Sequence, residues 1–142
     1  MSQTGLITNL FLSIKGQGRE EQQTLTLDEN GVVGDKFYGK NASRAILLTS
    51  KESYTLALKN GIEAKYGSLG ENILIDVNPY SLSVGEKVYI GEVILEITHN
   101  CTICQSLAKV DPKLPELLAN DRGIFAKCIQ AGTISKNDTV TL

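Results

Sequence analysis

Short stretches in which apolar and polar residues alternate run along the chain, and this pattern predicts a protein built mainly from β-strands. In residues 92–97, Val93, Leu95 and Ile97 fall on one side, which is typical of a half-buried antiparallel strand. Alternation also predicts a strand at residues 10–14, and a compact apolar run predicts one at 45–49. Further strands are expected at residues 24–27, 72–76, 87–90, 124–130 and 139–142. We therefore expect a single α+β domain over residues 1–142, mainly an antiparallel β-barrel-like structure with two or three short helices.

Two segments carry the signals of helices. Thr49 and Glu52 form a capping-box pattern and Gly61 provides a stop, so the clearest helix is expected to begin at Thr49 and end before Gly61. Its expected buried face consists of Tyr54, Ala57 and Leu58. A second short helix is expected to begin at Asp111-Pro112, because proline is tolerated in the first turn of a helix. Its expected buried face consists of Leu114, Leu117 and Leu118.

Glycine and asparagine mark the expected turns. Three glycines fall within residues 31–39, which predicts an ordered loop with unusual backbone dihedral angles or a close backbone approach. Residues 84–90 resemble residues 136–142, with Gly85 and Asn137 in matching positions, and both residue types tolerate a left-handed turn. Two similar turn-and-strand units suggest a barrel or a sandwich.

Composition narrows the range of partners. The chain has 142 residues, of which 42% are hydrophobic and 21% are charged, and its formal net charge is -2. It has no basic stripe, so we expect no nucleic-acid partner. No apolar run approaches the ~20 residues of a membrane span, and the N-terminus shows no signal-peptide pattern. Three cysteines argue for free thiols over a disulfide framework, so we expect a soluble protein of the cytoplasm that binds no membrane.

The segment Cys101-x-x-Cys104 is the leading candidate for chemistry, because it directly follows an expected strand. Thiolate is a soft ligand for zinc, copper and similar metal centres, and it is also a nucleophile that can hold sulfur as a persulfide. Three other interpretations stay open. The cysteines could be buried structural residues, zinc ligands together with His99 and Cys128, or a thioredoxin-like pair, although the expected βαβ setting is missing. His99 could also tune a neighbouring thiol.

A few polar residues are candidates for anion binding. The guanidinium groups of Arg44 and Arg122 suit the forked geometry of a phosphate or a carboxylate, although each could equally form an ordinary surface salt bridge. Glu71 and Asn72 stand at the start of an expected strand, where they could simply cap a turn. Asp35 lies in the glycine-rich loop, but the spacing there matches neither a dinucleotide-binding fingerprint nor a P-loop.

Eight segments, each a weak motif by itself, follow one another along nearly the whole chain. They are Ser13-x-Lys15-Gly16, Gly31-Val32-Val33-Gly34-Asp35 with Gly39, Arg44 with its apolar strand, Gly70-Glu71-Asn72-Ile73-Leu74, Val84-Gly85 with Ile90-Gly91-Glu92, the thiol segment, Arg122-Gly123-Ile124-Phe125-Ala126, and Gly132-Thr133-Ile134. In this order they resemble the MOSC domain, which is named for the C-terminal region of molybdenum cofactor sulfurase. The length resembles the short, free-standing bacterial members. The resemblance implies a β-barrel fold.

The resemblance also implies a link to the molybdenum cofactor, molybdopterin, and to pyridoxal phosphate. In family members that reduce N-hydroxylated compounds, a cysteine thiolate binds molybdenum beside the pterin dithiolene, and the second cysteine of the pair is the ligand. Carried over, the catalytic metal ligand is Cys104, with Cys101 as the fallback. Arg44, and with it Lys36 or Arg122, would hold the phosphate, and Gly34 and Gly70 would allow close backbone approach. The other expected cofactor-binding residues are Asp35, Glu71 and Asn72.

The leading hypothesis is therefore a cofactor-binding oxidoreductase that reduces N-hydroxylated or similar small molecules, with a redox protein as a potential partner. One alternative is a carrier of persulfide sulfur or of the cofactor without turnover, which would need a sulfur donor. Another is a non-catalytic β-barrel that binds a partner. Phe37 stands where the family often has histidine, and Ala45 where it has glutamine. The first difference removes a polar group and leaves the role of that position open.

Overall fold

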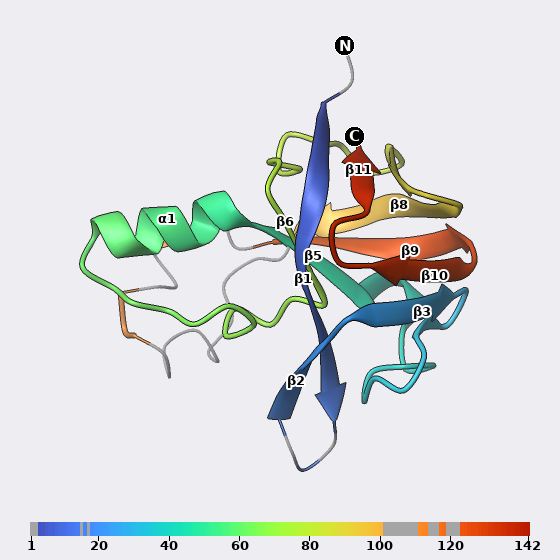
Figure 1. Cartoon of the computed structure of the whole chain (residues 1–142), viewed down its shortest axis with the longest axis horizontal. Coiled ribbons are helices and arrows are strands. Elements are labelled where there is room, and N and C mark those ends of the chain that lie inside the picture. Colours follow the sequence, from blue (N-terminus) through green and yellow to red (C-terminus); the bar gives the residue numbers. More distant parts are fainter. Residues whose placement is uncertain (1–2, 15, 17, 101–110, 114–116, 119–122) are drawn as a thin grey trace.

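The computed structural model describes residues 3–14, 16, 18–100, 111–113, 117–118 and 123–142 (Figure 1). Two sheets account for the strands in these residues. The strands are β1 (Thr4–Ile14), β2 (Gly18–Gln22), β3 (Thr24–Asp28), β4 (Gly31–Val32), β5 (Ile46–Ser50), β6 (Ile73–Ile75), β7 (Lys87–Ile90), β8 (Val93–Asn100), β9 (Ile124–Gln130), β10 (Gly132–Ser135) and β11 (Thr139–Thr141). The larger sheet has the order β11-β7-β8-β9-β5-β6-β1-β2, and the smaller has the order β10-β3-β4.

The larger sheet closes on itself as a barrel. The strand β1, the first in the sequence, pairs with β6 and β2 along its length. The start of β1 also pairs with β11, which lies at the other end of the strand order. This pairing joins seven strands into a closed ring, from which β2 extends as a hairpin with the end of β1. Every pairing in the ring is antiparallel except that of β5 with β6. The expected β-barrel is therefore confirmed.

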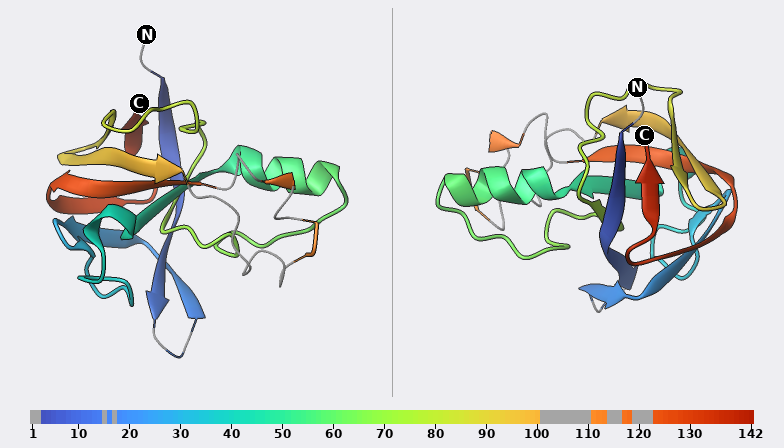
Figure 2. Two further views of the ribbon diagram at one scale, coloured as in Figure 1. Left: turned by 180° about the vertical axis from the view of Figure 1, so that it is seen from behind. Right: turned by 45° about the horizontal axis from the view of Figure 1, so that its top comes forward.

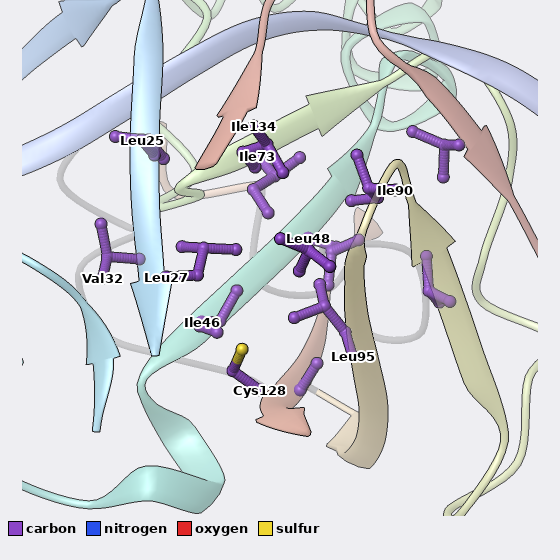
Figure 3. Close-up of a cluster of buried hydrophobic side chains, with 14 of the residues drawn as sticks. Leu25, Leu27, Val32, Ile46, Leu48, Ile73, Ile90, Leu95, Cys128 and Ile134 are labelled. Carbon is purple, nitrogen blue, oxygen red and sulfur yellow. The ribbon is translucent and has the colours of Figure 1, made fainter. Parts of the chain in front are cut away.

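Alternation within the strands fills the barrel (Figure 3). On β8, the side chains of Val93, Leu95 and Ile97 are 0%, 0% and 1% exposed, as the period of two residues predicts. They belong to a cluster of buried residues drawn from strands of both sheets. The cluster includes Cys128, which is 7% exposed and donates its thiol hydrogen to the carbonyl oxygen of Gln130. Burial raises the pKa of the Cys128 thiol, so this cysteine behaves as a small apolar residue of the core.

The helix α1 (Lys51–Lys59) begins later than the capping-box pattern predicts. Its N-cap is Ser50, whose hydroxyl accepts a hydrogen bond from the backbone N–H of Glu52 at 3.1 Å. The expected start at Thr49 is wrong, because Thr49 is fully buried inside β5. All five residues of β5 are buried, so the strand continues through Ser50 before the chain can turn into the helix.

The helix ends where the sequence predicts, but its buried face differs. Gly61 has φ +78°, and the N–H groups of Gly61 and Ile62 bind the carbonyls of Leu58 and Ala57, which is a Schellman motif. The buried residues of α1 are Ser53, Tyr54 and Ala57. Leu58 is 59% exposed, so its expected place on the buried face is wrong. Figure 2 shows that α1 points away from the barrel, so the barrel does not cover all sides of this helix.

Within the described residues, the expected two or three helices are not confirmed. The helices described there over their whole length are α1 and the short 3₁₀ helix η1 (Ala42–Arg44). The second expected helix starts at Asp111 and falls mostly outside the described residues. The Asp111 side chain accepts a hydrogen bond from the N–H of Lys113, as an N-cap residue does, and the N–H of Leu117 donates to the Lys113 carbonyl, as in an α-helix. The described part of the chain is mostly β, and none of its helices is long and apolar enough to cross a membrane.

The expected glycine turns are confirmed. Gly31, Gly34 and Gly39 have φ values of +119°, +88° and +75°, so the segment between them follows a path that other residues rarely adopt. Gly85 and Asn137 have φ values of +94° and +74°. The internal similarity in the sequence therefore corresponds to two equivalent left-handed turns, each of which leads into a strand of the barrel.

Candidate functional site

A cavity of about 650 Å³ opens on the side of the barrel where the β1–β2 hairpin, the glycine-rich loop and the segment before β6 meet. Its residues come from segments that are far apart in the sequence. The lining residues are Ser13, Gly18, Arg19, Lys36, Phe37, Lys40, Asn41, Arg44, Ala45, Leu47, Ser68, Gly70, Asn72 and Phe125. The volume lies in the range of sites for small molecules and cofactors, about 300–1,000 Å³.

The charge of the cavity is one-sided. Arg19, Lys36, Lys40 and Arg44 line it, whereas no aspartate or glutamate is found among its described lining residues. Within the described part of the chain, no salt bridge involves Lys36, Lys40 or Arg44. The whole chain has a net charge of -2. A positive cavity in a slightly acidic protein indicates a site for an anion.

Arg44 is placed by contacts with the ends of two strands. It ends η1, where the Asn41 side chain accepts a hydrogen bond from the backbone N–H of Ser43 at 3.1 Å. The Ser43 carbonyl in turn accepts a hydrogen bond from the Thr98 hydroxyl on β8 at 2.5 Å. The guanidinium carbon of Arg44 lies over the ring of Phe125, 5.1 Å from the ring centroid, in a cation–π contact. The side chain is therefore held at the cavity wall formed by β9.

Asp35 anchors the loop that carries Lys36 and Phe37. Its carboxylate is buried and accepts hydrogen bonds from the backbone N–H groups of Ser13 and Phe37, at 2.7 and 3.0 Å, and from the Asn72 side chain at 3.2 Å. The Lys36 N–H donates to the Ser13 carbonyl at 2.7 Å. The carboxylate of Asp35 is therefore committed to these hydrogen bonds inside the protein. Asp35 fixes the position of the loop but does not face the cavity.

Asn72 borders the cavity, but its side chain is committed to the frame. Its amide oxygen accepts from the N–H of Leu47, and its amide nitrogen donates to Asp35 and to the carbonyl of Phe11. Its backbone also binds Leu47 and Phe11, one through N–H and one through C=O. Asn72 thereby joins β5 to β1 at the point where β6 begins between them. It shapes the wall, and its donors are not free for a ligand.

Glu71 points away from the cavity into a buried network. One of its carboxylate oxygens accepts a hydrogen bond from the Tyr54 hydroxyl at 2.5 Å and another from the N–H of Gly67 at 3.0 Å. Burial raises the pKa of Glu71, and burial together with the adjacent carboxylate raises the pKa of Tyr54. The backbone carbonyl of Glu71 accepts a hydrogen bond from Arg19 at 2.9 Å. Glu71 therefore acts on the cavity through the position of Arg19.

The thiol segment with Cys101 and Cys104 lies outside the described residues, as does Arg122. The strand that leads to it, β8, ends at Asn100, which pairs with Ile124. Just before that end, the ring of His99 contacts the ring of Phe125 edge to face, with centroids 5.8 Å apart. Phe125 lines the cavity. The chain therefore enters the thiol segment beside the cavity wall.

The zinc interpretation that adds Cys128 to His99 does not fit this geometry. Cys128 pairs with Leu95, four residues before His99 on β8. Four residues of a strand span about 13 Å, whereas two ligands of one zinc ion lie roughly 4 Å apart. The described residues contain no cluster of three or more candidate metal ligands. Cys128 thus belongs to the core and to no site with His99.

The structure divides the residues predicted from the sequence. Those that line the cavity are Lys36, Arg44, Gly70 and Asn72, and those that do not line it are Gly34, Asp35 and Glu71. The sequence analysis missed Arg19, Lys40 and Phe125. Arg19 and Lys40 each follow a glycine of positive φ, at +79° and +75°. A basic residue directly after a turn glycine is the signal that could have identified both.

The fold and the cavity define a closed β-barrel with a basic cavity, and the comparisons with known proteins identify its family. The family model of the MOSC domain matches residues 34–141, so the chain belongs to the MOSC domain family. No curated protein is detectably similar to it in sequence. MOSC domains are generally associated with the molybdenum cofactor.

Solved structures share the fold. The YuaD protein of Bacillus subtilis has a TM-score of 0.81 at 20% identity, with 99% of this chain and 96% of that chain covered. YiiM of Geobacillus stearothermophilus has a TM-score of 0.71 at 14% identity, with coverage of 99% and 75%. YiiM of Escherichia coli has a TM-score of 0.73 at 16% identity, with coverage of 97% and 68%. At these identities the likeness shows the architecture alone.

Proposed function

We propose that this MOSC domain binds the molybdenum cofactor in the basic cavity and that the thiolate of Cys104 is a ligand of the metal. The observation that carries the proposal is the charge of the cavity, with four basic side chains and no carboxylate among its described lining residues. A phosphate group needs such compensation, and guanidinium and ammonium groups supply charge-assisted hydrogen bonds to it. Arg44 and Lys36 would hold the phosphate, assisted by Arg19 and Lys40.

The shape of the cavity also fits a phosphate-bearing pterin. Its volume of about 650 Å³ is sufficient for a molecule of that size. Gly70 gives the wall a point without a side chain, where φ is +98°. Apolar surface from Leu47, Phe37 and Phe125 lies beside the basic groups, as a ligand with a flat ring and a charged end requires.

The choice of Cys104 rests on the path of β8. That strand passes Phe125 in the cavity wall and leads directly into the thiol segment. Cys101 is the fallback, because it stands nearer to the end of the strand. Thiolate is the softest ligand that a protein offers and suits molybdenum. When bound, the cofactor would supply the oxidation–reduction chemistry, and the protein would supply binding and orientation.

The activity that we propose is the reduction of N-hydroxylated or similar small molecules in the cytoplasm, with electrons from a separate redox protein. The cavity opens to the surface, since Lys36, Phe37 and Lys40 on its rim are all exposed. A small substrate could therefore approach a bound cofactor directly. Pyridoxal phosphate, which also joins a phosphate to a flat ring, is a second ligand that the same charges would accept.

A carrier without turnover is the second candidate function. The exposure of the rim that admits a substrate would equally allow a cofactor to be handed to another protein. A persulfide carrier would hold sulfur on Cys104 or Cys101 and would receive it from a donor such as a cysteine desulfurase. Sulfur that cyanide releases from the wild-type protein but not from Cys104→Ser would support this candidate. Unchanged cellular function of the double Cys→Ser variant would instead favour a barrel that only binds a partner.

The test of the proposal is the metal content of protein purified from a host supplied with molybdate. Molybdenum and zinc would be measured in the wild type, Cys104→Ser, Cys101→Ser and Arg44→Gln. The control is Lys127→Gln, which removes a basic residue of β9 that pairs with Glu96 away from the cavity. We expect stoichiometric molybdenum in the wild type and the control, none in Cys104→Ser, and a several-fold loss in Arg44→Gln.

The other outcomes separate the candidates. Molybdenum lost in Cys101→Ser but retained in Cys104→Ser would move the ligand to Cys101. Loss of pterin together with molybdenum in Arg44→Gln would locate the binding in the cavity, because Arg44 does not belong to the thiol segment. A wild-type protein without molybdenum and without pterin from such a host would contradict the proposal.

A further inference from the structure

Phe37 presents an exposed aromatic ring at the rim of the basic cavity. Its side chain is 46% exposed, although it is one of only three phenylalanines of the chain. The backbone around it is fixed, because its N–H donates to the buried carboxylate of Asp35 at 3.0 Å and its carbonyl accepts from the N–H of Lys40 at 3.1 Å. The ring gains little burial in the folded protein, and the loop leaves its backbone little freedom to move away.

The other aromatic ring of the cavity, that of Phe125, already contacts two side chains of the protein. Phe125 has the guanidinium of Arg44 over its face and packs edge to face with the ring of His99. Within the described part of the chain, Phe37 has one cationic neighbour of this kind, the ammonium group of Lys36, whose nitrogen lies 5.1 Å from the ring centroid. Of the two rings, Phe37 is therefore the one with aromatic surface left for a ligand.

The basic residues cannot by themselves select a ligand. Ammonium and guanidinium groups bind a phosphate whatever it is attached to, so preference among phosphates must come from the uncharged part of the wall. Ala45 and Leu47 are buried and add apolar surface without a ring. Among the described lining residues, Phe37 is the exposed apolar side chain, and it stands beside Lys36 and Lys40.

We propose that Phe37 determines the specificity of the cavity by stacking against the flat ring system of a ligand that also carries a phosphate. The inference rests on the proposed function of the cavity as a phosphate site and adds a requirement for an aromatic heterocycle. Lys36 contributes to both parts, because it lies over the ring of Phe37 and lines the cavity itself. Stacking of this kind raises affinity by roughly three- to tenfold over a ligand that lacks the ring.

The test compares two ligands with the same phosphate. Adenosine 5′-monophosphate and ribose 5-phosphate differ by a flat heterocycle, and their affinities would be measured by calorimetric or NMR titration. We expect the wild type to prefer the nucleotide by roughly three- to tenfold. Phe37→Leu should bind both ligands equally, whereas Phe37→Tyr should keep the preference. The control is Val33→Ala, which changes a 45% exposed side chain of the same loop outside the cavity.

Several results would overturn this role of Phe37. They are equal affinities in the wild type, a preference that survives in Phe37→Leu, or no measurable binding of either phosphate. The molybdenum measurement stands apart from this test. Stoichiometric molybdenum without a preference for the nucleotide would overturn the role of Phe37 alone. A preference that depends on Phe37, in a protein that never contains molybdenum, would establish the stacking site and contradict the proposed cofactor.

Discussion

Asn72 donates a side-chain hydrogen bond to the carboxylate of Asp35 over 3.2 Å, and the two residues are 37 positions apart in the sequence. The bond joins the glycine-rich loop to the segment before β6, which are two of the motifs that the sequence presents separately. It also connects two walls of the cavity, since Asn72 lines one and Asp35 holds the loop of the other. The stability of the fold and the shape of the site therefore depend on the same buried contact.

The first prediction concerns this contact. Asp35→Ala should lower the free energy of unfolding by about 3 kcal/mol, because it leaves buried donors of Ser13, Phe37 and Asn72 without their acceptor. Asp76→Ala, which removes an exposed carboxylate that accepts from the N–H of Leu6, should cost about 1 kcal/mol or less. Urea unfolding measures both.

A double-mutant cycle with Asn72→Ala completes that experiment. Asp35 and Asn72 touch, so the double variant should be more stable than the sum of the single changes predicts, by about 1 kcal/mol. Phosphate affinity should fall in Asp35→Ala and stay unchanged in Asp76→Ala. Equal costs for the two aspartates would show that Asp35 is no anchor.

The second prediction concerns the hydroxyl of Tyr54. It donates to Glu71 and accepts from the N–H of Gly67 at 2.9 Å, all in buried surroundings. Tyr54→Phe should therefore lower the free energy of unfolding by about 1–3 kcal/mol. Tyr66→Phe is the matched control, because Tyr66 packs edge to face against Tyr54 but is 44% exposed. Thermal or urea unfolding that shows the same small loss in both would argue against the buried network.

The third prediction concerns pH. Burial raises the pKa of Glu71 above its ordinary value of 4.5, so the folded protein holds this proton more tightly than the unfolded chain does. The contribution of Glu71 to stability is fully present below pH 4.5 and is lost as the pH rises through the folded pKa. Glu71→Gln keeps an oxygen that can accept from Tyr54 and carries no titrating proton.

The measurement is urea unfolding of the wild type and Glu71→Gln at several pH values from 4 to 8. The wild type should lose stability relative to Glu71→Gln as the pH increases. Glu63→Gln, at an exposed position, controls for the removal of one carboxyl group. A wild type that instead gains stability relative to Glu71→Gln would mean that hydrogen bonds to the charged carboxylate outweigh the effect of burial on its pKa.

The fourth prediction separates two reasons for a glycine, a positive φ and the lack of space for a Cβ. Gly31 and Gly39 both have positive φ, at +119° and +75°. An added Cβ at Gly31 would lie 2.7 Å from the Cβ of Ala45, whereas at Gly39 it would meet nothing within 4 Å. Gly39→Ala should therefore cost about 1 kcal/mol for backbone strain alone, and Gly31→Ala should cost clearly more. Equal losses in urea unfolding would mean that Ala45 moves aside freely.

Some features of the fold could be read from the sequence because they depend on neighbouring residues. The alternation in β8 placed Val93, Leu95 and Ile97 in the core, since a strand turns every second side chain the same way. The sequence alone did not decide which residue caps α1. Thr49 and Ser50 both suit an N-cap, and burial of the whole of β5 decided for Ser50.

The sequence by itself determined most of the strands, the left-handed turns and the family, because these rest on local pattern and on the order of short motifs. It did not predict β2, whose residues show no apolar alternation. Only the tertiary structure decided which polar residues face the cavity. Glu71 and Arg19 are 52 positions apart, yet pairing of the strands brings the Arg19 side chain to the Glu71 carbonyl and turns the Glu71 carboxylate inward to Tyr54. No local pattern carries that information, since burial of a side chain depends on what distant segments place against it.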